Sequence, residues 1–370
     1  MDGNYNLSIL IPAYNNTESL IRALESLKNQ TIAKKLNILI SDDCSPSPIN
    51  KSEIFNFKNS FSQLLFFRQN LNLGVLSNPT WLFNQIKTEY FAVFQHDDIL
   101  IRKNFYEDVL QKFDSNEKLV CYFGNSITIR INENTNLDNY EEIQNSNLML
   151  NFDSPKIKGI RKDGSISGED FIDNIVNQYD DFNTAWSAIV FKTNSVRNFG
   201  GFGGYYCLSW FEAKSLSVYR EEEFYGCLYL LCLQGDMQLE AKPSVIRCLE
   251  PTSYSESPTH PVRKMRQDGE IYAFFKIAWI AEKFFNGENV EKVIMNIYKK
   301  CSKLPLREET KNSQLFFKTY FPNNAKFKKA AYSALDSSRK LKSPFEFIFK
   351  VKGYLRYYRN IFRDKLKNKF

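Results

Sequence analysis

The sequence predicts an α/β protein with a mainly parallel sheet that is flanked by helices. Short apolar runs alternate with amphipathic helical patterns over the first 125 residues, and such alternation is typical of βαβ units. Each apolar run is also followed by polar or turn-forming residues, which mark the end of a strand.

The expected elements follow in chain order. Five strands are expected in the first part of the chain, at Leu7–Ile11, Leu36–Ile40, Gln63–Phe67, Tyr90–Phe94 and Val120–Phe123. The helices between them are expected after Thr17 as the N-cap, within Trp81–Ile86 and at Phe105–Phe113. Farther along, we expect helices at Glu169–Val176 and Glu221–Leu233, and strands at Trp186–Phe191 and Val245–Leu249.

The chain of 370 residues has room for one large domain and an appendage. We expect the α/β domain to span residues 1–255, with residues 131–180 as an insertion rich in Asn, Asp and Ser. Residues 256–370 are expected to form a helical, basic and aromatic region. No apolar segment approaches the roughly 20 residues that a membrane span needs.

The net charge of +7 is unevenly distributed, because residues 301–370 carry +13 and the rest of the chain carries −6. In residues 340–370 the cations alternate with Phe and Tyr, which suits the surface of an anionic membrane. We therefore expect peripheral membrane contact through residues 340–370 and no nucleic-acid partner. A plain solvated helix has a similar composition and stays open as an alternative.

The seven cysteines lie at scattered spacings, without a CxxC pair or a Cys/His zinc pattern. Their odd number and the absence of a signal-peptide pattern at the N-terminus predict reduced thiols. We therefore expect a cytoplasmic location, with peripheral attachment at the inner face of the cell membrane.

The motif His96-Asp97-Asp98 follows the apolar run Tyr90–Phe94. Adjacent carboxylates at a strand end suit Mg²⁺ or Mn²⁺, which take oxygen ligands and commonly keep substrate phosphates in their shell. An Asp-rich turn in which Asp98 only caps a helix is the alternative. Polar residues also follow the three preceding strands, and in a parallel sheet all four ends lie along one edge, where ligands bind.

Two common nucleotide-binding fingerprints are missing from the sequence. A GxGxxG pattern does not follow the first strand, and a GxxxxGK[ST] loop occurs nowhere in the chain. These absences argue against a dehydrogenase and against a P-loop NTPase.

Four segments together resemble the successive motifs of family 2 glycosyltransferases, which have the Rossmann-like GT-A fold. They are Leu7–Asn15, Asp42–Ser45, Asn72–Gly74 and Gln95–Asp98. The resemblance runs in register over residues 7–125 and resumes more loosely at 185–250. It implies that residues 1–255 form a GT-A glycosyltransferase domain.

The resemblance also implies roles for these residues. Pro12, Tyr14, Asp42 and Asp43 would hold the nucleoside of a nucleotide-diphosphate sugar, and Asn72 and Gly74 would lie beside it. Asp97 would bind the ribose and the metal, and Asp98 is the preferred ligand of the Mn²⁺ or Mg²⁺ that bridges the diphosphate.

The chain departs from the family pattern at two positions. Gln95 stands where family members often have Asp, and residues 77–80 lack the Arg that often follows the Asn-x-Gly motif. By resemblance to other GT-A enzymes, His260 would be a third metal ligand. Arg263 and Arg266, one helical turn apart, would face the diphosphate in place of the missing Arg.

Residues 199–202 resemble the Gly-Gly-Phe turn that, in the family, precedes an acidic pair containing the general base. Counting back from Gly235 places Glu223, or else Glu222, in that role, with Glu212 as a fallback. Acidic residues in a first helical turn also favour the helix dipole without any catalytic role.

The expected function is inverting transfer of a sugar from a nucleotide-diphosphate sugar to a glycan or polyprenyl-linked glycan, in surface polysaccharide biosynthesis. Gln95 and the missing Arg favour an alternative, a non-catalytic subunit that binds a nucleotide sugar or glycan within an assembly complex. A third hypothesis is nucleotidyl transfer, and the absence of a Gly-rich triphosphate loop after the first strand argues against it.

Overall fold

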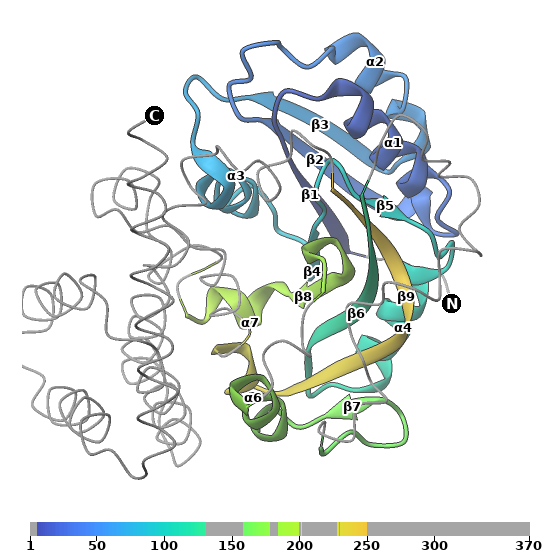
Figure 1. Ribbon diagram of the computed structural model, residues 1–370, viewed down its shortest axis with the longest axis vertical. Coiled ribbons are helices and arrows are strands. Elements are labelled where there is room, and N and C mark those ends of the chain that lie inside the picture. The colour runs from blue at the N-terminus through green and yellow to red at the C-terminus, as the bar shows by residue number, and fades with distance from the viewer. Residues whose placement is uncertain are drawn as a thin grey trace, which may run out of the picture. The chain divides into compact units, whose positions relative to one another are not determined.

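The computed structural model describes residues 6–130, 158–177, 184–199, 201, 228 and 230–249 (Figure 1). These residues form a nine-stranded sheet with the order β3-β2-β1-β4-β8-β6-β9-β5, and β7 pairs with β9 off this path. The predicted boundary at residues 255 and 256, the tail and most of the helix expected at Glu221–Leu233 lie outside the described residues.

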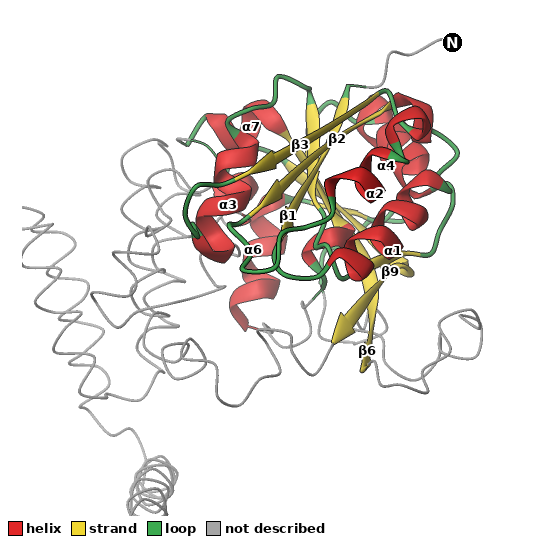
Figure 2. Cartoon of the chain, turned by 90° about the horizontal axis from the view of Figure 1, so that it is seen from above, coloured by secondary structure: helices red, strands yellow, loops and turns green. Residues whose placement is uncertain are grey.

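The first four strands are parallel neighbours. They are β1 (Leu7–Ala13), β2 (Leu36–Asp42), β3 (Gln63–Arg68) and β4 (Tyr90–Val93). In Figure 2 the arrowheads of β1, β2 and β3 lie on the same side of the domain. The sequence therefore correctly predicted that these strand ends share one edge.

The rest of the sheet is mixed. It contains β5 (Ile99–Leu100), β6 (Leu119–Arg130), β7 (Ser165–Ile166), β8 (Ile189–Lys192) and β9 (Asp236–Leu249). Strands β6 and β9 are parallel, whereas β8 is antiparallel to β4 and β6, and β9 is antiparallel to β5 and β7. The sequence did not reveal β5 and β7, because two residues carry no readable alternation.

Six α-helices are described: α1 (Thr17–Lys28), α2 (Lys51–Phe55), α3 (Gly74–Phe83), α4 (Phe105–Ser115), α6 (Gly168–Asn177) and α7 (Thr193–Arg197). The N-cap expected at Thr17 is wrong, because Asn16 precedes the helix and its Oδ1 accepts the N–H of Ser19 at 3.0 Å. Short 3₁₀ helices occur at Ala33–Lys35, Lys58–Ser60 and Trp186–Ala188. Only the second half of the strand expected at Trp186–Phe191 is therefore extended.

The insertion expected at residues 131–180 is described for residues 158–177 alone. There, Ser165 and Ile166 pair with Met237 and Gln238 of β9. This part of the insertion therefore adds a short strand to the main sheet.

The core lies between the parallel strands and the helices beside them. Leu20 and Leu24 of α1 join Ile9 of β1 and Ile38 of β2 in one buried cluster. All seven residues of β1 are buried, as is typical of a central parallel strand that is covered on both faces. The residues at the carboxyl ends of these strands are thus attached to a buried, well-packed part of the sheet.

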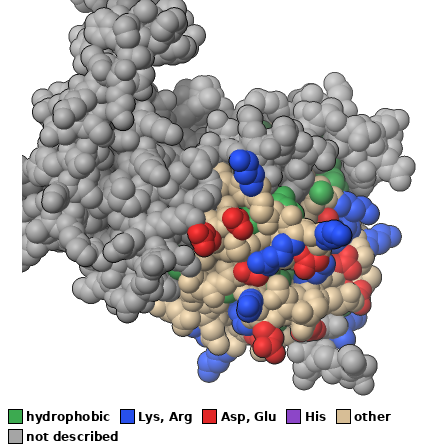
Figure 3. All heavy atoms as spheres, turned by 90° about the horizontal axis from the view of Figure 1, so that it is seen from below, with side chains coloured by type: hydrophobic (Ala, Val, Ile, Leu, Met, Phe, Trp, Pro, Cys, Tyr) green, Lys and Arg blue, Asp and Glu red, His purple; other side chains and the backbone are tan. Residues whose placement is uncertain are grey.

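The described helices and one face of the described surface bear on possible contact with a membrane. None of the helices in the described ranges is long and apolar enough to cross a membrane. On the face in Figure 3, the described Lys and Arg side chains are interspersed with Asp and Glu side chains. No disulfide joins the four described cysteines, Cys44, Cys121, Cys232 and Cys248.

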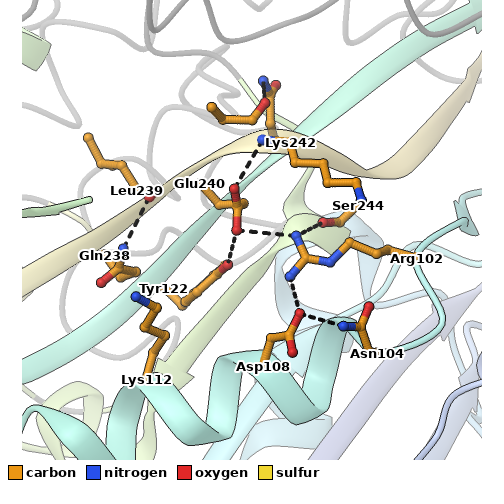
Figure 4. Close-up of polar contacts among 12 residues, drawn as sticks. Arg102, Asn104, Asp108, Lys112, Tyr122, Gln238, Leu239, Glu240, Lys242 and Ser244 are labelled. Carbon is orange, nitrogen blue, oxygen red and sulfur yellow. Dashed lines mark hydrogen bonds and ion pairs between the residues drawn. The ribbon is translucent and has the colours of Figure 1, made fainter. Parts of the chain in front are cut away.

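An ionic network connects α4, β6 and β9 just after β5 (Figure 4). The side chain of Arg102, only 10% exposed, donates through Nη2 to Asp108 Oδ2 at 2.5 Å and through Nη1 to Glu240 Oε2 at 3.2 Å. The hydroxyl of Tyr122 donates to the same Glu240 oxygen at 3.0 Å. Because β5 leads directly into Arg102, the network fixes the chain that leaves this strand.

The network also changes the acidity of Glu240. Burial alone would raise the pKa of this carboxyl, but the Lys242 N–H, the charge of Arg102 and the Tyr122 hydroxyl together hold the pKa below its ordinary value. A lowered folded-state pKa stabilises the fold above the unfolded-state pKa. This stabilisation is lost as the pH falls through the folded-state value.

We therefore expect Glu240→Gln to lower the free energy of unfolding by about 1–2 kcal/mol at pH 7. The difference from the wild type should shrink below the ordinary glutamate pKa of 4.5. Urea denaturation at several pH values measures this difference in the free energy of unfolding. Glu25→Gln is a control, because Glu25 forms an exposed ion pair with Lys28 and should cost little. Equal losses in the two variants at pH 7 would contradict the prediction.

Candidate functional site

The candidate site lies where the four parallel strands end. In register, Ala13 of β1 lies beside Asp42 of β2, which lies beside Arg68 of β3. On the other side of β1, the N–H of Phe94 bonds to the carbonyl of Leu10 at 2.8 Å. The residues that follow these strands therefore meet along a single edge.

The carboxylate of Asp42 is only 1% exposed and is surrounded by donors. Its Oδ1 accepts the N–H of Ser45 at 3.0 Å and the Ser45 hydroxyl, and its Oδ2 accepts Nη1 of Arg68. The Ser45 hydroxyl in turn accepts the N–H of Asn15 at 2.8 Å, and Arg68 Nη2 donates to the Ser45 carbonyl at 2.8 Å. We call Asn15, Asp42, Ser45 and Arg68 the Asp42 cluster, and it joins the ends of β1, β2 and β3.

The backbone around this cluster is unusual in two places. Asn15 has a φ of 64° and Cys44 a φ of 56°, both in the left-handed region that non-glycine residues rarely adopt. The bonds of the Asp42 cluster hold the chain on either side of these residues. The loops after β1 and β2 are thereby kept in one conformation.

Asp43 connects the loop after β2 with the start of α3. Its carboxylate accepts the N–H of Leu73 at 2.6 Å and the N–H of Gly74 at 2.8 Å. Gly74 has a φ of +86°, which explains why glycine is needed at this point of the Asn72-Leu73-Gly74 motif. Burial raises the pKa of Asp43 to about 6, although the two N–H groups lower it in part.

Residues 95–98, which we call the acidic turn, follow β4. His96 and Asp97 are half-buried, and among the described residues no hydrogen-bond donor engages the carboxylate of Asp97. Asp98 is 2% exposed, and its N–H bonds to the carbonyl of Gln95 at 3.1 Å, which closes the turn. The two adjacent carboxylates therefore have different surroundings.

The carboxylate of Asp98 is directed into the protein. Its Oδ2 accepts the hydroxyl of Ser187 at 2.5 Å, and its Oδ1 accepts the N–H of Cys248 at 3.4 Å. Burial, and next the negative charge of Asp97, raise the pKa of Asp98 above its ordinary value, and the Ser187 hydroxyl offsets this only in part. Asp98 therefore joins the acidic turn to the segment before β8 and to β9.

The other predicted site residues fall into two groups. Pro12 is buried within β1, whereas Tyr14 is 41% exposed and Asn72 is exposed, at the same edge of the sheet. Six predicted residues lie outside the described part of the chain, so their roles stay predictions; they are Glu212, Glu222, Glu223, His260, Arg263 and Arg266.

Sequence reasoning missed Arg68 and Ser187 and quoted Ser45 only as part of a motif. Arg68 could have been suspected, because it ends a strand whose parallel neighbour ends in an acid. Nothing in the sequence points to Ser187, which is 89 residues from its partner Asp98.

In the described ranges, no group of three or more His, Cys, Asp or Glu side chains could hold a metal ion. Mg²⁺ and Mn²⁺ nevertheless are commonly bound through one or two carboxylates, with substrate phosphates and water completing the shell. The carboxylate of Asp97, engaged by no described donor, fits this mode of binding.

Comparisons with known proteins agree with this geometry. Residues 8–168 match the family model described as Glycosyl transferase family 2. GalNAc(5)-diNAcBac-PP-undecaprenol beta-1,3-glucosyltransferase of Campylobacter jejuni is 29% identical over 167 residues, which are 45% of this chain and 47% of that protein. Minor teichoic acid biosynthesis protein GgaB of Bacillus subtilis is 29% identical over 117 residues, which are 31% of this chain and 13% of that protein. The chain thus spans about half the length of the first relative and less of the second.

Among solved structures, S. aureus TarS 1-349 in complex with UDP-GlcNAc is similar in fold. The TM-score is 0.55 at 12% sequence identity, over 90% of this chain and 80% of that chain. The mixed sheet with flanking helices is thus a Rossmann-like GT-A fold. The match of residues 8–168 to the model of glycosyl transferase family 2 confirms the family resemblance seen in the sequence over this part of the chain.

The raised pKa of Asp43 can be tested by an NMR titration. We expect the amide signals of Leu73 and Gly74 to shift with a midpoint near pH 6, because both N–H groups donate to this carboxylate. Since a pKa of about 6 lies above the ordinary value of 3.8, protonation of Asp43 favours the folded state as the pH falls. Asp43→Asn should abolish the titration, and a midpoint near 4 in the wild type would contradict the prediction.

Proposed function

We propose that this chain is an inverting glycosyltransferase that takes a sugar from a nucleotide-diphosphate sugar. The observation that carries the proposal is the position of Asp97 just after β4, at the edge of the sheet where β1, β2 and β3 also end, within the residues that match the family 2 model. The nucleoside would lie against Pro12, Tyr14 and the loops that Asp42 and Asp43 hold. Arg263 and Arg266 are proposed to face the diphosphate.

The proposed metal is Mn²⁺ or Mg²⁺, which would neutralise charge on the departing nucleoside diphosphate. The geometry supports Asp97 as its principal protein ligand, because Asp98 already accepts hydrogen bonds from Ser187 and Cys248. Asp98 is then a supporting residue of the acidic turn, which differs from the preference drawn from the sequence. His260 remains the proposed additional ligand.

The proposed acceptor is a glycan or a polyprenyl-linked glycan of a surface polysaccharide. The C. jejuni relative carries undecaprenol in its name, and the B. subtilis relative is named for teichoic acid biosynthesis. Peripheral membrane contact through residues 340–370 belongs to the same proposal. Flotation with anionic vesicles, with and without these residues, would test this contact.

Glu223, or else Glu222, is proposed to remove the proton from the acceptor hydroxyl. The oxygen then attacks the anomeric carbon from the face opposite the leaving diphosphate. An α-linked donor would thereby give a β-linked product.

One observation favours the alternative, a nucleotide-sugar or glycan-binding subunit without turnover. Gln95 stands where the family often has a carboxylate, and of the pair Asp97 and Asp98 only Asp97 is unengaged by a described donor. A thermal-shift panel of UDP-, GDP-, dTDP- and CMP-sugars, followed by a transfer assay, separates the two functions. Donor binding without hydrolysis or transfer would favour the subunit.

We expect Asp97→Asn to lower turnover by about 100-fold or more, because the charge that holds the metal at the diphosphate is lost. The melting temperature without donor should stay near that of the wild type, since Asp97 is half-buried and accepts from no described donor. Donor hydrolysis with Mn²⁺ measures the effect, and Asp163→Asn, in the turn before β7, is the control. Unchanged turnover in Asp97→Asn would refute the metal assignment.

The double variant Glu222→Gln/Glu223→Gln should lower transfer by about 10²–10⁴-fold, since neither amide can accept the proton. Binding of the donor should persist in the thermal-shift assay. Glu221→Gln is a matched control from the same acidic run. Full transfer activity in the double variant would exclude both glutamates as the base.

A further inference from the structure

Ser187 lies in the 3₁₀ helix Trp186–Ala188, immediately before β8. The residue is completely buried, although its side chain is polar. A buried hydroxyl needs partners, because an unpaired polar group in the interior is costly. Both partners of the Ser187 hydroxyl lie in the acidic turn.

The hydroxyl of Ser187 joins the two ends of that turn. It accepts the backbone N–H of Gln95 at 2.8 Å and donates to Asp98 Oδ2 at 2.5 Å. The bond from the Asp98 N–H to the Gln95 carbonyl, at 3.1 Å, completes the closed arrangement. Asp97 lies between the residues that these three bonds fix, so the bonds determine the direction of its backbone.

The segment that carries Ser187 is held by bonds that do not involve the turn. The N–H of Ala185 donates to the Ser126 hydroxyl at 2.9 Å, and the Thr184 hydroxyl donates to the carbonyl of Gly124 at 2.7 Å. Ser126 and Gly124 belong to β6, within the sheet. Ser187 therefore holds the acidic turn in a fixed position relative to the sheet.

We propose that Ser187 is a positioning residue that holds Asp97 toward the donor diphosphate and its metal. This inference rests on the proposed function of the acidic turn and concerns a side chain that neither the motifs nor the family match identifies. Hydrogen-bond partners of this kind orient metal ligands, and their loss typically weakens metal affinity by about 10–100-fold.

The test compares Ser187→Ala with Ser165→Ala. Ser165 is also buried, and its hydroxyl donates to Asp163 Oδ1 at 2.8 Å and accepts from Arg161 Nη1 at 3.1 Å, so each variant loses one bond to a carboxylate and one from an N–H group. Both should lower the melting temperature. Ser187→Ala alone should weaken Mn²⁺ binding by about 10-fold or more in calorimetry with whichever of UDP, GDP or dTDP stabilises the wild type most.

A second measurement follows the hydrogen bond from the Gln95 N–H to the Ser187 hydroxyl directly. Hydrogen exchange at the Gln95 amide should accelerate in Ser187→Ala and stay unchanged in Ser165→Ala, because only the first variant removes its acceptor. Ser187→Cys, which is somewhat larger but keeps a weak donor, should lie between serine and alanine in both measurements. It also provides a folded variant if the alanine variant is unstable.

A double-mutant cycle with Asp98→Asn tests whether Ser187 positions Asp97 through its hydrogen bond to Asp98. If Ser187 acts through Asp98, the double variant should bind Mn²⁺ about as weakly as the weaker single variant, rather than showing the summed losses. Mn²⁺ affinity within twofold of the wild type in Ser187→Ala, or unchanged exchange at Gln95, would overturn the positioning role and leave the proposed function intact. If the wild type itself binds no Mn²⁺ with any of these nucleotides, the metal assignment within the proposed function fails, and the positioning role fails with it.

Discussion

The buried carboxylate of Asp42 is the constraint on which this edge of the sheet depends. A charge that is 1% exposed is tolerated only when donors surround it. The donors come from Ser45 in the next loop and from Arg68 on the neighbouring strand, and the same Ser45 hydroxyl also holds Asn15 after β1. Satisfying one charge thus fixes two loops and the end of β3, including the two left-handed residues that an isolated loop would not keep.

The other buried carboxylates along this edge are also satisfied by hydrogen-bond donors, which come from different parts of the chain. Asp43 is satisfied by backbone N–H groups at the start of α3, and Asp98 by a serine and a backbone N–H from segments far away in the sequence. Three of the four acids that suggested a ligand site therefore connect parts of the protein. Asp97 differs, because the described residues offer it no donor. Carboxylates that hold the edge together and a carboxylate that no described residue engages thus occur side by side.

The sequence predicted the parallel strands β1 to β4 well, because buried strands leave continuous apolar runs that end in polar turns. It also correctly predicted that the four motif segments lie at one edge of the sheet. It could not tell Asp97 from Asp98, since adjacent residues of one type look alike until their surroundings are known. Ser187 was unpredictable for a related reason: its two bonds span about ninety residues, and no local pattern records them. The N-cap at Asn16 was missed by one residue, because Asn and Thr both serve in that role.

A fragment that is to fold into this sheet must extend through strand β9. The family match ends at residue 168, yet β8 lies between β4 and β6, and β9 pairs with β5, β6 and β7. A fragment cut at the end of the match would lose both strands. It would also lose Glu240, Ser187 and Cys248, and with them the partners of Arg102 and Asp98. Its unpaired strand edges would favour aggregation. The folding unit therefore extends at least about eighty residues beyond the end of the family match, and expression of an isolated domain has to include them.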